Sequence, residues 1–299
     1  MTAAQQRAAA DYLQKRYGVS QRRVSRVLRR ARSTLRYQSQ PRVGEEAVVK
    51  AIRRTARRHR RWGYKRVHAR LEHQGWRLNR KRVRRLWIAL GLKRPRRRKK
   101  PRKHGVWPGS SANSCVNQPA GFKNDVWTYD FIQDRTEDGK ALKWLSIVDE
   151  YTRECLALYV ASSVTGADVR RILARVVGRR GAPTRIRSDN GSEFICPSLN
   201  GWLAVMGMKA IPVAPARPWE NGFIESFHSR LRDELLNAEE FESVTDAQAR
   251  AAWWRREYNT IRPHSGIGYQ TPKQYSDACD RGRPGPPRPR TKDLRIKNR

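Results

Sequence analysis

The chain has 299 residues, 38% of them hydrophobic, which is long enough for roughly two or three small domains and at least one folded core. Its 65 Lys and Arg oppose 27 Asp and Glu, a formal net charge of +38, which predicts a polyanionic partner such as nucleic acid and leaves a structural RNA or an anionic membrane surface open. The four cysteines are scattered, which argues against a disulfide framework and a zinc ribbon and indicates a reduced, cytosolic compartment. The lack of a long apolar run argues against a signal peptide and a membrane helix.

The first 40 residues predict a small helical domain. Residues 3–17 have a helical pattern that ends at Tyr17-Gly18, and Ser20 is a candidate N-cap for a second helix. That helix carries Val24, Val27 and Leu28 at the i, i+3 and i+4 spacing of one helix face. Two short helices around a glycine-containing turn are typical of half a helix-turn-helix module.

Residues 45–93 predict a second helical domain that binds DNA. One helix surrounds residues 62–71 and stops near Gly75, and Asn79 is placed to cap the next helix. That next helix is apolar on one face and densely basic on the other, as a DNA-contacting helix must be, although a solvated basic surface has the same pattern. The expected DNA-binding residues of this domain are Lys65, Arg66, Arg80, Lys81, Arg82 and Arg85.

Two further basic segments lack core residues. Residues 94–122 predict a flexible linker in which Arg97, Arg98 and Lys99 contact DNA. Residues 279–299 are rich in Pro, Gly and Arg and predict a disordered basic tail.

Residues 123–278 predict a mixed α/β domain with a helical extension at its C-terminal end. Strand patterns cover 126–132, 141–148, 156–161, 184–188 and 209–213. Thr165 is placed to cap a helix after the third strand, and further helices are expected at 198–207, 219–236 and 245–258. Three strands in a meander, followed by alternating helices and strands, describe one mixed sheet covered by helices.

Three carboxylates in this domain are placed for metal-assisted phosphodiester chemistry. Asp130 lies within the first strand, Asp189 lies where the fourth strand ends, and Glu225 lies in the long helix. Two Mg²⁺ ions about 3.5–4 Å apart can clamp the attacking and leaving oxygens of a phosphodiester, and several converging carboxylates are needed to bind them. Taken singly, each carboxylate also fits an ordinary role: an edge-strand surface residue, a turn residue or a solvated helix residue.

The combination of these residues resembles a known family. Thirty-five residues separate Asp189 from Glu225, which is the spacing of the Asp, Asp-35-Glu signature of retroviral integrases and many insertion-sequence transposases. Arg232 follows Glu225 by seven residues, where the family carries Lys or Arg, and it lies two turns further along the same helix face. The surrounding stretches 127–131, 186–194 and 220–228 are also similar to the family's motifs.

The resemblance to OrfB-type transposases extends over nearly the whole chain. Residues 62–68 and 79–86 look like the helix-turn-helix segment that precedes the family's core, and residues 258–264 through Thr271-Pro272 look like its C-terminal signature. The zinc-binding His/Cys arrangement of retroviral integrases is not matched, because His59, His68 and His73 have no cysteines nearby.

The resemblance implies an RNase H-like catalytic core that holds two Mg²⁺ or Mn²⁺ ions on Asp130, Asp189 and Glu225. It implies hydrolysis at the ends of the element, followed by attack of the freed 3′-hydroxyl on a second phosphodiester. Arg232 would contact DNA beside Glu225. The implied partners are double-stranded DNA (element ends and target), further copies of the chain, and a segment encoded in an upstream reading frame.

Several alternatives remain open from the sequence. A DNA-binding regulator of the element would need only the helical domains and the linker, and a ribonuclease of similar fold would need only the core. Asp149 is the nearest rival to Asp130. His228 and His264 are either DNA contacts or structural residues.

Overall fold

The computed structural model describes residues 3–37, 44–92, 115, 117–189, 191–213 and 221–282. They divide into two compact units, 1–51 and 52–299. Most of the expected linker (residues 94–114, with Arg97, Arg98 and Lys99) and of the expected tail (residues 283–299) lies outside the described residues. None of the described helices is long and apolar enough to cross a membrane.

The first unit contains the three helices α1 (Ala3–Tyr17), α2 (Gln21–Val27) and α3 (Arg32–Arg36). The two predicted helices are confirmed, and the third was not expected. Gly18 follows α1 with φ +63°, a left-handed conformation that glycine adopts without strain. The Ser20 hydroxyl accepts a hydrogen bond from the Arg23 N–H and so caps α2 as predicted. Ala10 of α1 and Val24 of α2 are buried in this unit.

Helices α4 (Glu45–Arg58), α5 (Tyr64–His73) and α6 (Arg80–Ala89) form the second predicted helical segment, and α4 crosses the boundary between the two units. The Asn79 side chain accepts a hydrogen bond from the Lys81 N–H at 2.8 Å, so the predicted cap of α6 is confirmed. The apolar face of α6 is buried as the pattern predicted, through Val83, Leu86 and Trp87.

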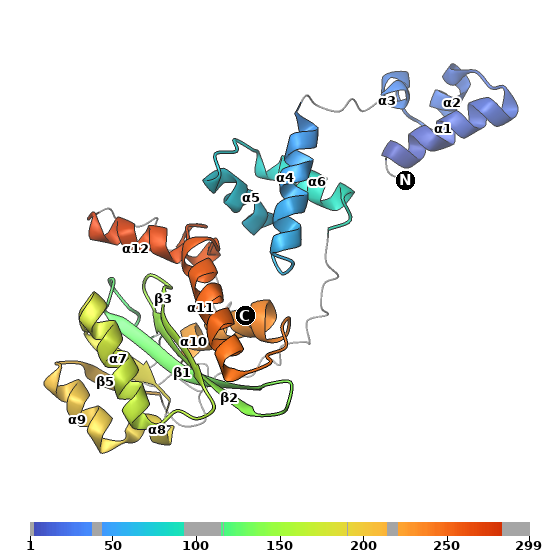
Figure 1. Ribbon diagram of the computed structural model, residues 1–299. Coiled ribbons are helices and arrows are strands. Elements are labelled where there is room, and N and C mark those ends of the chain that lie inside the picture. The colour runs from blue at the N-terminus through green and yellow to red at the C-terminus, as the bar shows by residue number, and fades with distance from the viewer. Residues whose placement is uncertain are drawn as a thin grey trace, which may run out of the picture. The chain divides into compact units, whose positions relative to one another are not determined.

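The core domain is built on a five-stranded mixed sheet in the order β3-β2-β1-β4-β5 (Figure 1). Its strands are β1 (Val126–Arg135), β2 (Ala141–Asp149), β3 (Cys155–Ala161), β4 (Arg185–Ser188) and β5 (Lys209–Pro212). The first three strands are antiparallel neighbours, and β4 and β5 run parallel to β1. This is the RNase H-like arrangement that the sequence implied. The first strand differs in one detail, because β1 continues to Arg135, beyond the expected end at residue 132.

Helices cover both faces of the sheet (Figure 1). On one face, α7 (Gly166–Arg180), α8 (Ser192–Ile195) and α9 (Pro197–Val205) pack on Trp127 and Tyr129 of β1. On the other face, α10 (Gly222–Leu231) and α11 (Val244–Thr260) pack on Ile132 of β1 and Trp144 of β2. Because successive side chains of a strand point to opposite faces, β1 contributes to both hydrophobic cores.

The long helix expected at 219–236 takes a different form in the structure. It begins as α10 at Gly222 and becomes a π-helix over Arg232–Leu236, while residues 219 and 220 lie outside the described residues. The apolar residues that predicted it are buried as expected: Phe227, Leu231 and Leu235.

Helix α11 also covers the outer edge of β3, which ends the sheet on that side. Asn259 accepts a hydrogen bond from the Cys155 N–H at 2.9 Å and donates one to the Cys155 carbonyl at 2.8 Å. Gln248 donates to the Val160 carbonyl at 2.9 Å, and Arg255 donates to the Leu156 carbonyl. These side chains satisfy backbone groups that an open edge would offer to another strand.

After α11 the chain passes through a 3₁₀ turn (Ser265–Ile267) into α12 (Pro272–Asp280), a helix that the sequence did not predict. His264, immediately before this turn, is buried and packs edge-on against Tyr258, with ring centroids 4.6 Å apart. Burial and the nearby Arg262 charge hold the pKa of His264 well below its usual value of 6.5.

We predict that His264 makes the core less stable in mild acid. The unfolded chain takes up a proton on His264 below pH 6.5, whereas the folded chain keeps it neutral, so stability is lost as the pH falls. Between pH 7 and 5.5 this contributes about 1 kcal/mol of lost stability. Urea denaturation at both pH values should show a smaller loss for His264→Gln than for the unsubstituted chain, and equal losses would contradict the prediction.

Candidate active site

The structure brings Asp130, Asp189 and Glu225 into one neighbourhood. Burial, together with the negative charges of Asp189 and Glu225, raises the pKa of Asp130 to about 7. Asp130 is partly buried within β1, whereas Asp189 and Glu225 are exposed, after β4 and in α10. Carboxylates from three separate elements therefore lie within electrostatic reach of Asp130, as their positions in the sequence suggested.

Asp130 also has a histidine beside it. The Nδ1 atom of His228 lies 3.7 Å from Oδ2 of Asp130, and its Nε2 atom lies 3.2 Å from the Ser146 hydroxyl. Ser146 is fully buried and is the direct cross-strand partner of Asp130 in β2. Burial and the nearby Arg232 charge lower the pKa of His228 to about 4, so a neutral imidazole borders the carboxylate.

The loop after β4 is fixed by a buried aromatic residue. The Phe194 ring stacks on Phe131 at 4.9 Å and meets Tyr129 edge-on at 4.5 Å. Asp189, five residues earlier, accepts a hydrogen bond from the Gly191 N–H at 3.1 Å. The apolar residue in the motif Ser188–Phe194 therefore ties the Asp189 loop to the strand that carries Asp130.

A buried hydrogen bond positions the start of α10. The Thr128 hydroxyl of β1 donates to the Asn221 side-chain oxygen at 2.6 Å, and both residues are buried. Asn221 immediately precedes α10, so this bond fixes the helix that carries Glu225 against the strand that carries Asp130. The sequence contained Asn221 within the motif beside Glu225, but its role was missed because its partner is 93 residues away.

A buried ion pair supports the same end of the sheet. Arg187 of β4 and Glu150, which follows β2, are both fully buried and in direct contact. Arg187 also donates to the Gln118 carbonyl at 3.0 Å. Two residues further along the chain, β4 ends at the Asp189 loop.

Asp149, the rival to Asp130, has a structural environment. Its side chain is fully buried and accepts hydrogen bonds from the backbone N–H groups of Asn124, Tyr151 and Thr152 at 2.8–3.0 Å. Arg180 lies 3.7 Å away. A carboxylate with its oxygens occupied in this way shapes the turn between β2 and β3 and is not available to an incoming ligand.

The sequence also matches models of known domain families. An integrase core domain model matches residues 122–218, a second integrase core domain model matches residues 206–272, and a helix-turn-helix-like domain model matches residues 44–100. The chain is 34% identical over 264 residues to a 31.7 kDa protein of insertion element IS407 from Burkholderia multivorans, covering 88% of this chain and 93% of that protein. The chain belongs to the insertion-sequence transposases with an integrase core.

Two further similarities complete the comparison. The transposase of insertion sequence element IS904 from Lactococcus lactis is 27% identical over 245 residues, covering 79% of this chain and 96% of that protein. The HTLV-2 integrase catalytic core in complex with magnesium aligns at 16% identity with a TM-score of 0.41, covering 52% of this chain and 97% of that chain.

The basic residues predicted to bind DNA lie in different environments in this transposase chain. Lys65, Arg80, Lys81, Arg85 and Arg232 are exposed, and Arg82 is half-buried. Arg66 is also half-buried and lies 3.8 Å from Glu234, and burial lowers the pKa of Arg66 to about 10. Contact with DNA stays a prediction for all of them, and at Arg66 it would compete with this ion pair.

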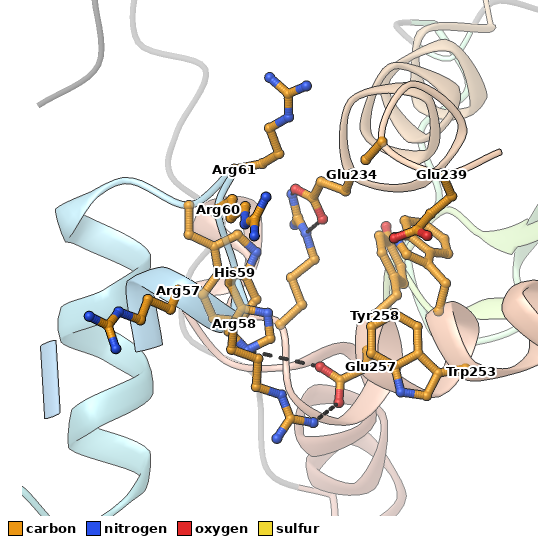
Figure 2. A pocket seen from close by; sticks show the side chains of 14 residues that line it. Arg57, Arg58, His59, Arg60, Arg61, Glu234, Glu239, Trp253, Glu257 and Tyr258 are labelled. Atoms are coloured by element: carbon orange, nitrogen blue, oxygen red, sulfur yellow. Dashed lines mark hydrogen bonds and ion pairs between the residues drawn. The ribbon is translucent and has the colours of Figure 1, made fainter. Parts of the chain in front are cut away.

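A pocket beside Glu234 holds further ion pairs that join the end of α4 and the residues after it to the C-terminal helices (Figure 2). Arg58 lies 2.8 Å from Glu257, and Arg61 lies 3.6 Å from Asp233. The His59 ring stacks on Trp62 with centroids 3.8 Å apart and also faces Glu257. Several arginines of this region are therefore paired with carboxylates of the same chain.

We predict opposite effects on stability for the two candidate aspartates. Asp149→Asn should lower the free energy of unfolding by about 1–3 kcal/mol. The amide NH₂ group of Asn would then face backbone N–H donors, whose hydrogen bonds only an oxygen can accept. Asp130→Asn should raise the unfolding temperature measured without divalent ions, because it removes a carboxylate repelled by Asp189 and Glu225. Thermal unfolding of both variants in EDTA tests this, and equal destabilisation would show that Asp130 is structural too.

Proposed function

We propose that this transposase cleaves DNA at the ends of its insertion element and joins those ends to a target, with Asp130, Asp189 and Glu225 as its metal ligands. The observation that carries the proposal is the placement of Asp130 on β1, which pairs with β4 and lies beside α10, whose His228 is 3.7 Å from Asp130; burial and the charges of Asp189 and Glu225 raise the pKa of Asp130 to about 7. Burial and the two neighbouring charges oppose the ionisation of Asp130, and a bound cation would reverse that effect.

The donor chemistry of this cluster fits Mg²⁺ or Mn²⁺. Carboxylate oxygens are the hard ligands that Mg²⁺ prefers. When bound, two such ions stabilise the attacking and leaving oxygens of an in-line phosphodiester displacement. As they stand, no three His, Cys, Asp or Glu side chains among the described residues form a closed ligand set, and one Asp189 oxygen is engaged by the Gly191 N–H. Binding of the ions would therefore require the three side chains to move toward one another.

Other side chains support the reaction without carrying it. Arg232 is exposed and has no hydrogen-bond or ion-pair partner among the described residues, so it is free to contact a phosphate beside Glu225. His228 stays neutral near neutral pH and occupies one side of Asp130. Thr128, Asn221 and Phe194 position the elements that bear the carboxylates.

The proposed partners are double-stranded DNA, as element ends and as target, and further copies of the chain, since two ends must be held together. The helical segment of α4–α6 and the basic residues that follow it would supply affinity for DNA. A segment encoded in an upstream frame would add to it. A regulator without catalysis would share this DNA binding and differ only in the outcome of the following experiment.

We predict that Asp189→Asn abolishes strand joining while binding to element ends survives. Labelled element ends, target DNA and Mg²⁺ or Mn²⁺ would be incubated with the full chain. Asp130→Asn and Glu225→Gln should behave in the same way, whereas Glu240→Gln, which removes an exposed carboxylate elsewhere, should leave joining intact. Joining by Asp189→Asn would refute the metal-ligand assignment, and no joining by the unsubstituted chain would favour the regulator.

We predict that Arg80→Ala combined with Lys81→Ala flattens the salt dependence of DNA binding. Both side chains are exposed at the start of α6. Each lost phosphate contact should reduce the slope of log affinity against log salt concentration by about 0.9. The matched double variant Arg135→Ala and Lys209→Ala removes two exposed charges from the core and should leave the slope unchanged. An unchanged slope for the α6 variant would remove this role.

A further inference from the structure

Positive charge is distributed unevenly between the core and the rest of the chain. Residues 117–282 contain 22 Lys and Arg and 22 Asp and Glu, so the net charge of +38 arises entirely outside them. Within this neutral domain, the 15 residues of α7 carry five arginines and one aspartate. Helix α7 is therefore a local concentration of positive charge that the domain as a whole does not share.

The arginines of α7 face solvent. Arg170, Arg171, Arg175 and Arg179 are exposed. Arg171 pairs with Asp168 at 2.8 Å, but Arg170, Arg175 and Arg179 have no hydrogen-bond or ion-pair partner among the described residues. Arg171, Arg175 and Arg179 follow one another at i, i+4 and i+8 on one helix face, where like charges repel. The arrangement is unfavourable for the isolated helix and becomes favourable against a polyanion.

Two shallow grooves flank α7 and meet at Arg175. The groove on the α9 side is lined by Arg170, Arg171 and Arg175 without any acidic residue, together with Ser198 and Trp202. The groove on the α11 side runs along β3, and its basic lining residues outnumber its single acid, Glu154. The basic lining residues on the α11 side are Lys123, Arg175, Arg179, Arg180 and Arg255.

This surface lies across the sheet from the candidate active site. Trp127 and Tyr129 of β1 pack in the core beneath α7. Thr128 bonds to Asn221 at the start of α10, and Ile132 packs in the core with α10. Asp130 shares the second face by strand alternation and lies beside His228 of α10. DNA bound to α7 would therefore be a different stretch from the DNA at the carboxylates.

We propose that the outer face of α7 binds the sugar-phosphate backbone of a second stretch of duplex DNA; this inference rests on the proposed DNA transposase function. Arg179 lies nine positions after Arg170, about 14 Å along the helix. Duplex DNA presents one phosphate per ~1.7 Å of its axis, so about eight phosphates lie within that reach. Guanidinium groups bind phosphate oxygens in a bidentate manner without reading base sequence.

The shape and charge of the face favour DNA over a second copy of the chain. Ala174 and Gly178 lie between the arginines and allow a backbone to approach closely. A symmetric contact through α7 would set arginines against arginines, which opposes association. An acidic protein could bind the same arginines, and the cross-linking test below distinguishes it from DNA.

The first test is site-specific photo-cross-linking in the full chain carrying Asp189→Asn. A photoreactive phenylalanine analogue at Ala174 should cross-link to a radiolabelled duplex of arbitrary sequence. The same analogue at Val205, which is 85% exposed on α9, should not. Absence of a DNA adduct at Ala174, or an adduct only with protein, would overturn the proposal. Because cross-linking requires no catalysis, its outcome is independent of whether strand joining succeeds.

The second test measures the salt dependence of binding. Arg175→Ala combined with Arg179→Ala should reduce the slope of log affinity against log salt concentration by about 1.8, or 0.9 per contact. The Arg135→Ala and Lys209→Ala variant is again the matched control. Equal slopes for the α7 variant and the unsubstituted chain would overturn the proposal, and circular dichroism of each variant checks that α7 is still folded.

Discussion

Three carboxylates repel one another, and the core must hold them together against that repulsion. Burial and the charges of Asp189 and Glu225 raise the pKa of Asp130 to about 7. The opposing force comes from contacts that link the three elements: Phe194 packed on β1, Asn221 bonded to Thr128, and the buried pair of Arg187 with Glu150. These contacts fix the three elements relative to one another before any ion binds, as the proposed metal-assisted chemistry requires.

The chain separates affinity from chemistry by charge. The core is neutral, with 22 basic and 22 acidic residues between 117 and 282, while the segments around it carry the whole excess of +38. In a neutral core, the carboxylates are not surrounded by an excess of arginines. The basic segments provide the sequence-independent attraction to DNA, and α7 is the place where the core itself adds to it.

The sequence predicted most elements of the core because their patterns are local. Short sequence segments were enough to predict the strand around Trp127 and the caps at Ser20, Asn79 and Thr165, and the structure confirms them. The π-helical turn that begins at Arg232 could not be predicted from the sequence, because an α-helix has nearly the same spacing of apolar residues. Helix α12 was missed because its Thr271-Pro272 start was recognised as a family motif and not as a cap.

For the candidate site, the sequence by itself determined which carboxylates to consider, through the 35-residue spacing and the strand context. It favoured Asp130 by its strand context and kept Asp149 as the nearest rival, because both lie in or at the end of strands. The tertiary structure gives them different environments: three N–H groups from the β2–β3 turn and from Asn124 occupy Asp149, whereas Asp130 lies beside His228 and within the electrostatic influence of Asp189 and Glu225. The physical reason is that environment depends on contacts between residues far apart in the chain, which no local pattern encodes.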